Sequence, residues 1–99
     1  MKTSARLLFA LLAILMLASP VEARRLDPDD ARKLMEKGDI LPLEQIMKIN
    51  ERELTGRIIE VELERKRGMF VYEIKILPPD GRRREFYIDA RTGEIIRRK

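Results

Sequence analysis

The chain has 99 residues, a formal net charge of +4 and 38% charged residues. This length predicts one small domain. The sequence contains no histidine and no cysteine, and its only serines are Ser4 and Ser19. Such a composition argues against Ser-His and Cys-His catalysis, and against zinc sites built on thiolate or imidazole groups. We therefore expect a protein that is not an enzyme, with no catalytic residue, no resident metal and no cofactor.

Residues 1–23 have the organisation of a secretory signal peptide. A basic start precedes the uncharged apolar run 7–18, and small or compact residues precede a predicted cut after Ala23. A helix of that run would span about 18 Å, short of the roughly 30 Å hydrocarbon core of a bilayer, so a cleaved signal is favoured over a retained anchor. We therefore predict a periplasmic or secreted protein whose mature domain, residues 24–99, has no stable membrane span.

Two helices are expected at the start of the mature domain, after a loose end at residues 24–25. Asp27 is suited to cap the first helix, and Gly38 is suited to end it. A second helix is predicted over residues 42–54, with Gly56 as its stop. The predicted apolar face of this second helix comprises Leu43, Ile46, Met47 and Leu54.

Runs of alternating apolar and charged residues follow, and this alternation predicts strands. In antiparallel sheets such a pattern turns one face to the core and the other to water. The chain therefore predicts an α+β fold, with one or two N-terminal helices packed on one face of a 3–4-stranded antiparallel meander sheet. The predicted strands are 59–64, 72–76, 84–88 and 94–98. In the last strand, either Ile95 or Ile96 could point inward.

The strand register can be predicted because a slip of one residue would turn every side chain to the other face. A two-residue turn at Arg67-Gly68 matches apolar residues across the first hairpin, and a three-residue loop at 79–81 does so across the second. The matched pairs of the first hairpin are Ile59 with Ile76, Val61 with Ile74 and Leu63 with Tyr72. Those of the second are Ile74 with Phe86 and Tyr72 with Ile88. These residues form the predicted buried face of the sheet.

Several residues at the ends of these strands are assigned to turns rather than to chemistry. Glycine tolerates positive φ, and the side chains of aspartate and threonine bond to backbone amides nearby. The predicted turn residues are Gly68, Asp80, Gly81, Asp89, Thr92 and Gly93.

The other face of the sheet is predicted to be charged. The carboxylates of Glu60, Glu62 and Glu64 could bind a hard cation or act as a general acid. A solvated face, balanced by Lys75 and Arg83, is the favoured interpretation, because antiparallel sheets commonly leave one face in water.

Basic residues cluster at 66–67, 82–84 and 97–99. A nucleic-acid surface would need aromatic residues interleaved with them for stacking, and most aromatics here belong to the predicted core face. We therefore predict no nucleic-acid partner. The clusters protect sheet edges against aggregation, but arginine is also enriched at protein interfaces. The candidate partner-binding residues, chosen by expected exposure and residue type, are Arg83, Tyr87 and Arg91.

Residues 41–97 resemble the PepSY domain. The resemblance rests on the helix followed by Leu-Thr-Gly, on Tyr-Glu-Ile in the middle strand, and on the closing run Tyr-Ile-Asp-Ala-Arg-Thr-Gly-Glu at 87–94. This closing run is similar to the family's Val-Asp-Ala-x-Thr-Gly signature, with Ile88 in place of valine. The resemblance implies a small secreted or periplasmic module without catalytic residues, of a family thought to inhibit or regulate peptidases. Asp89 and Gly93 transfer from it as turn-formers.

Two functions are compatible with these features. The first is an exported, non-enzymatic protein-binding or regulatory module, which acts on a peptidase or another envelope protein. The alternative is a periplasmic sensor that binds a cation or an anionic envelope component through its carboxylate or arginine face.

Overall fold

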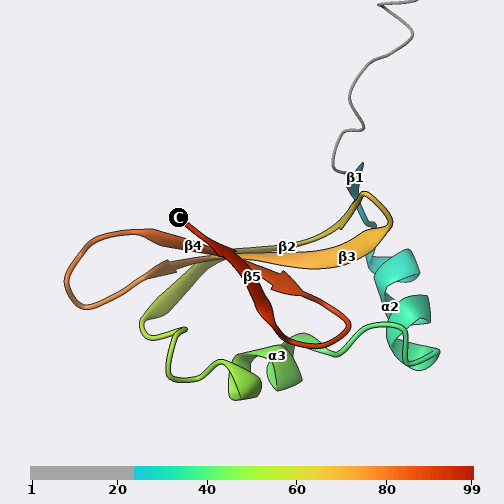
Figure 1. The fold of residues 1–99 in the computed structure, drawn as a ribbon, viewed down its shortest axis with the longest axis horizontal. Coiled ribbons are helices and arrows are strands. Elements are labelled where there is room, and N and C mark those ends of the chain that lie inside the picture. Colours follow the sequence, from blue (N-terminus) through green and yellow to red (C-terminus); the bar gives the residue numbers. More distant parts are fainter. Residues whose placement is uncertain (1–23) are drawn as a thin grey trace, which may run out of the picture.

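The computed structural model describes residues 24–99, which form two helices and one antiparallel sheet (Figure 1). The sheet is a meander with the strand order β1-β2-β3-β4-β5. Its elements are β1 (Arg24–Arg25), α2 (Pro28–Glu36), α3 (Leu43–Ile49), β2 (Arg57–Lys66), β3 (Met69–Leu77), β4 (Arg84–Asp89) and β5 (Ile95–Arg98). The predicted α+β class is confirmed. The predicted signal peptide, residues 1–23, and its cut lie outside the described residues.

Strand β1 is the element for which the sequence gives no signal. Arg24 pairs with Arg65, and Arg25 pairs with Glu64, so β1 forms one edge of the sheet beside β2. The prediction of a loose end at residues 24–25 is therefore wrong. Alternation could not reveal this strand, because backbone pairing at a sheet edge requires no apolar side chain. β1 adds a fifth strand to the three or four expected from alternation.

Helix α2 begins and ends where the sequence predicts. The Asp27 carboxylate accepts a hydrogen bond from the Asp30 N–H at 2.9 Å, and Gly38 adopts a φ of +77° just beyond the helix. The same bond holds the pKa of Asp27 below its ordinary value. The helix is peripheral, because none of its residues is fully buried and Leu34 packs only partly against the core.

Helix α3 ends at Ile49, so the predicted continuation to residue 54 is wrong. The buried Asn50 side chain accounts for this stop: its Nδ2 group donates to the Ile46 carbonyl at 3.0 Å and to the Gly93 carbonyl at 2.9 Å. Asparagine side chains that bond to backbone groups compete with helix continuation. The residues that follow Asn50 form turns, and they still bring Leu54 into the core at 6% exposure.

The prediction that Gly56 stops a helix is also wrong. Gly56 has a φ of +121° and lies immediately before β2, well beyond the end of α3. A Cβ atom on Gly56 would lie 2.4 Å from the carbonyl oxygen of Leu77 and 2.7 Å from the Cα of Pro78. Glycine is required here because two backbone segments approach closely.

The register of the two central hairpins is confirmed. Val61 pairs with Ile74, and Ile74 pairs in turn with Phe86. Arg67 and Gly68 have φ values of 51° and 77°, as a two-residue hairpin turn of this kind requires.

Ile59 is the exception to the predicted register. A bulge between Ile58 and Glu60 pairs Ile58 with Ile76, so the predicted pairing of Ile59 with Ile76 is wrong. The extra residue of a bulge is left unpaired, and the Ile59 side chain is 45% exposed rather than buried.

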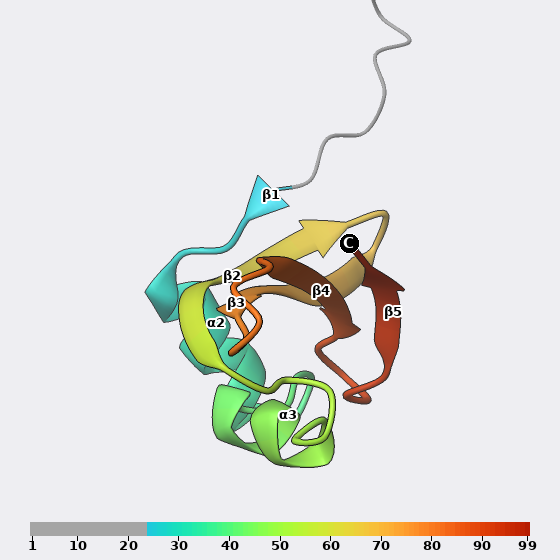
Figure 2. The same ribbon diagram turned by 90° about the vertical axis from the view of Figure 1, so that its left-hand side faces the viewer.

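The core lies between the sheet and the helices, which both occupy one side of the curved sheet (Figure 2). Val61 and Leu63 are partly buried at its margin, and the Tyr72 hydroxyl donates to the Leu41 carbonyl at 2.8 Å. Ile95 packs against the core and Ile96 is 50% exposed, which decides between the two inward-facing candidates of the last strand. The buried core comprises Ile40, Ile46, Leu54, Tyr72, Ile74, Ile76, Phe86, Ile88 and Ala90.

Within residues 24–99 no helix has the length and apolar character needed to cross a membrane.

Candidate functional site

The sheet face turned away from the helices, here called the open face, collects the charged side chains of β2, β3 and β4. Register places Glu62 opposite Glu73, and Glu73 opposite Tyr87. The next row places Glu60 opposite Lys75, and Lys75 opposite Glu85. Because paired residues of antiparallel strands share a face, the predicted alternation has produced one continuous polar surface.

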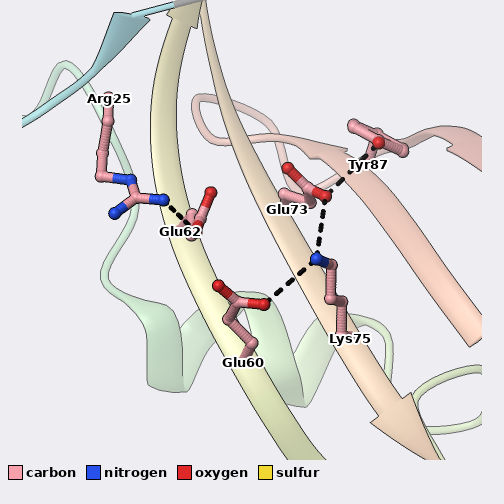
Figure 3. A network of polar contacts seen from close by, with 6 residues as sticks. All are labelled: Arg25, Glu60, Glu62, Glu73, Lys75 and Tyr87. Carbon is pink, nitrogen blue, oxygen red and sulfur yellow. Dashed lines mark hydrogen bonds and ion pairs between the residues drawn. The ribbon is translucent and has the colours of Figure 1, made fainter.

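The side chains of the open face form a connected network (Figure 3). The Lys75 Nζ atom lies 3.1 Å from a Glu60 carboxylate oxygen and 3.9 Å from one of Glu73. The Tyr87 hydroxyl donates to the same Glu73 oxygen at 3.4 Å. Arg25 of β1 forms an ion pair with Glu62 from the edge of the sheet. Lys75, Glu73 and Glu62 are shielded, with side-chain exposures of 21%, 14% and 15%.

This crowding changes the proton affinities of the carboxyl groups. A hydrogen bond to Glu60, followed by burial, raises the pKa of Glu62, and the same bond together with Lys75 lowers the pKa of Glu60. Burial, and then the nearby Glu64 carboxylate, raises the pKa of Glu73. The hydrogen bond with Glu60 raises the pKa of Lys75. Glu62 and Glu73 therefore hold a proton more tightly than an ordinary glutamate does, whereas Glu60 holds one less tightly.

The carboxylates of Glu62, Glu64 and Glu73 offer oxygens within 4.8 Å of one another, a spacing that a hard cation could bridge. Two protein cations already contact this cluster, because Arg25 pairs with Glu62 and Lys75 approaches Glu73. The cluster is therefore partly neutralised by the chain itself. Of the row expected from the sequence, Glu62 and Glu64 belong to this cluster, whereas Glu60 lies outside it and pairs with Lys75.

The open face has a second, basic part along β4 and β5. Arg97 and Lys99 both lie over the ring of Tyr87, with their charged groups 5.8 and 5.6 Å from the ring centre. Such placement is attractive because the ring face carries partial negative charge. Burial raises the pKa of the Tyr87 hydroxyl, so this group remains a proton donor at neutral pH.

The three candidate partner-binding residues lie along β4 but do not form one site. Arg83 precedes the strand and lines a shallow hollow with Glu85 and Lys99. Arg91 follows the strand and lines a different hollow, beside Phe70. Tyr87 lies midway between them and lines a third hollow. The six residues of β4 lie between Arg83 and Arg91, and at about 3.3 Å per residue they span roughly 20 Å.

The turn residues act through backbone geometry. Asp80 and Asp89 accept hydrogen bonds from the N–H groups of Arg82 and Arg91, each at 2.9 Å. The Thr92 hydroxyl accepts one from the Glu94 N–H at 3.2 Å. The glycines at positions 68, 81 and 93 have positive φ values of 77°, 76° and 82°.

Sequence reasoning missed the apolar hollow that Tyr87 lines. Val71 forms its floor at 7% exposure, while Met69 and Ile96 remain 43% and 50% exposed at its walls. A signal for it was present, because residues 69–72 are all apolar and so place apolar side chains on both faces of the strand. Arg25 was also missed as a partner of Glu62, since nothing local links residues so distant in the chain.

Comparison with known proteins found one family match. The model of the PepSY family, described as peptidase propeptide and YPEB domain, matches residues 40–99. This region contains α3 and strands β2 to β5, whereas β1 and α2 precede it. No curated protein and no solved structure matches the chain.

Proposed function

Since the chain belongs to the PepSY family, we propose that it is an exported, non-enzymatic protein-binding module that regulates a peptidase of the cell envelope or the surrounding medium. The observation that carries this proposal is the family match over residues 40–99. Domains of this family are generally non-catalytic propeptide or regulatory modules. A propeptide acts by contact with its peptidase, so the family match favours a function in which the chain binds another protein.

The composition and the N-terminal sequence support the proposal. The chain lacks histidine and cysteine, so the common nucleophile–base pairs of hydrolases have no counterpart. Residues 1–23 have the basic start and apolar run of an export signal, which would bring the domain to a compartment with secreted peptidases.

We place the partner contact along β4 around Tyr87, with Arg83 and Arg91 at its two ends. Tyrosine and arginine are enriched at protein interfaces because they combine a large contact area with polar groups. Since these three residues line separate hollows, a partner that touches all of them must extend along β4.

The test is a crosslinking capture from the envelope and secreted fractions, with the protein as bait and mass spectrometry as the readout. The proposal expects recovery of a peptidase, and inhibition of that peptidase when the purified protein is added at equal concentration. A variant with alanine at positions 83, 87 and 91 is the matched control for the contact surface. Capture of the same peptidase by this variant would refute the surface, and capture without any effect on peptidase activity would refute the regulatory role.

The alternative function, a cation sensor, has one observation in its favour, namely the convergence of Glu62, Glu64 and Glu73. A bound divalent cation would stabilise the folded chain by mass action. Thermal unfolding with increasing calcium or magnesium decides the question, with Glu64→Gln as the matched variant. A rise in melting temperature that this variant abolishes would favour the sensor, and no rise would count against it.

A further inference from the structure

Strand β5 forms one outer edge of the sheet (Figure 2). Glu85 and Lys99 exchange two backbone hydrogen bonds of 2.9 and 2.8 Å, so the backbone groups of Lys99 point toward β4. In an antiparallel pair the backbone N–H and C=O of the neighbouring residue point away from the partner strand. The N–H and C=O of Arg98 therefore face outward, where a further strand would bind.

An apolar hollow of about 190 Å³ lies on the open face beside this edge. Val71 forms its floor, and the half-exposed side chains of Met69 and Ile96 stand at its walls. This volume is several times what one water molecule needs, so the hollow has room for an apolar side chain. A strand added beside β5 would point alternate side chains toward the open face, and one of these could enter the hollow.

Basic side chains surround the hollow. Lys66, Arg67 and Arg97 line it, and Lys99 lies close by over the Tyr87 ring. Within residues 24–99 none of these four cations has an ion pair with an acidic group, in contrast to Lys75 at the centre of the open face and Arg25 at its β1 edge. This local excess of positive charge is complementary to an acidic ligand.

The arrangement of charges on the open face favours a narrow ligand, such as a single strand, over a broad surface such as a membrane. An anionic membrane surface lying on the open face would meet the basic edge at β5, but it would also meet the carboxylates of Glu62, Glu64 and Glu73 a few strands away. Like charges would oppose that contact. A single strand at the β5 edge touches only the basic part of the face.

We propose that an extended acidic segment of the partner protein binds along the outer edge of β5 as an additional strand, with one apolar side chain in the hollow. This proposal rests on the proposed function as a protein-binding module and names the contact. Backbone bonds at Arg98 supply affinity, Met69 and Ile96 enclose the apolar anchor, and the surrounding basic residues select acidic neighbours. The short length of β5 and its bulge beside Ile96 limit unspecific pairing at this edge.

The probe is a short, end-blocked peptide in which glutamate and leucine alternate, and its binding to the protein is followed by fluorescence anisotropy. The matched control peptide alternates lysine and leucine. We expect saturable binding of the acidic peptide alone, weakened by added salt because the charges are exposed. Absence of binding, or equal binding of both peptides, would overturn the proposal.

Two substitutions locate the contact. Ile96→Asp places a charge in the hollow and is expected to weaken binding about tenfold or more, since a buried aliphatic contact is lost. Arg97→Glu reverses one charge and should weaken binding and reduce its salt dependence. The controls are Ile59→Asp, which changes an isoleucine of similar exposure at β2, and Arg82→Glu in a separate basic cluster. Control variants that lose affinity as strongly as Ile96→Asp would refute this location.

Amide exchange distinguishes strand addition from surface adsorption. The outward Arg98 N–H should become protected when the acidic peptide is bound, because it gains a backbone partner. Protection confined to β2, or binding to anionic phospholipid vesicles in place of the peptide, would refute the proposal. The capture experiment separates the two claims: a peptidase retained by Ile96→Asp would leave the proposed function intact and remove this contact. Peptide binding without any captured peptidase would support this contact and count against the proposed function.

Discussion

Asn50 joins helix α3 to the turn that leads into β5, and its replacement tests the polar bonds of the core. Its side chain donates to the carbonyls of Ile46 and Gly93, at 3.0 and 2.9 Å, and the residue is 9% exposed. Asn50→Ala removes both bonds and leaves the Gly93 carbonyl without this donor. Each bond contributes about 1 kcal/mol net, and an unsatisfied buried carbonyl costs roughly 1–3 kcal/mol more. We expect the free energy of unfolding to fall by about 3 kcal/mol.

The assay is urea unfolding followed by circular dichroism. The midpoint should fall while the slope of free energy against urea stays constant, because the folded chain buries nearly the same surface. A loss of about 3 kcal/mol corresponds to a melting temperature roughly 15 °C lower in a domain of this size. Glu51→Ala changes the exposed neighbour and should stay within about 0.5 kcal/mol of the parent.

A second substitution separates lost hydrogen bonds from lost volume. Asn50→Asp keeps the size of the side chain but places a carboxylate against two carbonyl oxygens, so it should destabilise at least as much as alanine. The reasoning would be refuted if Asn50→Ala cost less than about 1 kcal/mol, or if Asn50→Asp restored the parent stability.

Three further predictions concern the backbone, the open face and the core. Gly56→Ala should cost at least about 3 kcal/mol in urea unfolding, because its φ of +121° is strained for alanine and the new Cβ would meet the Leu77 carbonyl oxygen at 2.4 Å; a cost below about 1 kcal/mol would contradict this. Burial raises the pKa of Glu73, so the folded chain holds this proton more tightly than the unfolded chain, and the corresponding stability is present in acid and lost as pH rises through the folded-state value. Glu73→Gln should therefore be more stable than the parent at neutral pH and should lose that advantage below the ordinary glutamate pKa, whereas a difference independent of pH would refute the assignment. Tyr72→Phe should cost about 1 kcal/mol in thermal unfolding, since it removes the 2.8 Å bond to the Leu41 carbonyl; an unchanged melting temperature would show that water replaces that bond.

Alternation predicted the sheet well because it specifies which side of each strand is buried. Val61, Ile74 and Phe86 could be matched across three strands from their spacing alone. The same rule failed at Ile58 and Ile59, where two adjacent apolar residues satisfy either register, and the bulge decides between them. Pattern alone cannot place a bulge between two residues of the same type.

Longer-range polar contacts could not be predicted from the sequence. Asn50 falls on the apolar stripe of its helix at a spacing that suggests continuation, and only the Gly93 carbonyl, 43 residues away, shows why it is buried. Arg25 reaches Glu62 across a similar separation. The carboxylate row and the position of Tyr87 on the open face were predictable from alternation, although Tyr87 is partly buried there. The separation of Arg83 from Arg91 follows from the length of β4, which lies between them.

The proposed binding edge is also expected to be a less stable part of the fold, which connects stability with recognition. β3 lies between two strands and holds several buried residues, whereas β5 has four residues, one neighbour and no buried side chain. Local opening at β5 should therefore require less free energy than global unfolding, and its amides should exchange before those of β3 in native-state hydrogen exchange. An acidic strand bound at the β5 edge should slow that opening by mass action. The exchange of β3 amides tracks global unfolding, so its free energy should rise by the same binding free energy and by no more. Equal exchange free energies for β3 and β5 in the unbound protein would mean that the edge is as firmly held as the core, and recognition could then draw on a rigid template without any ordering of β5.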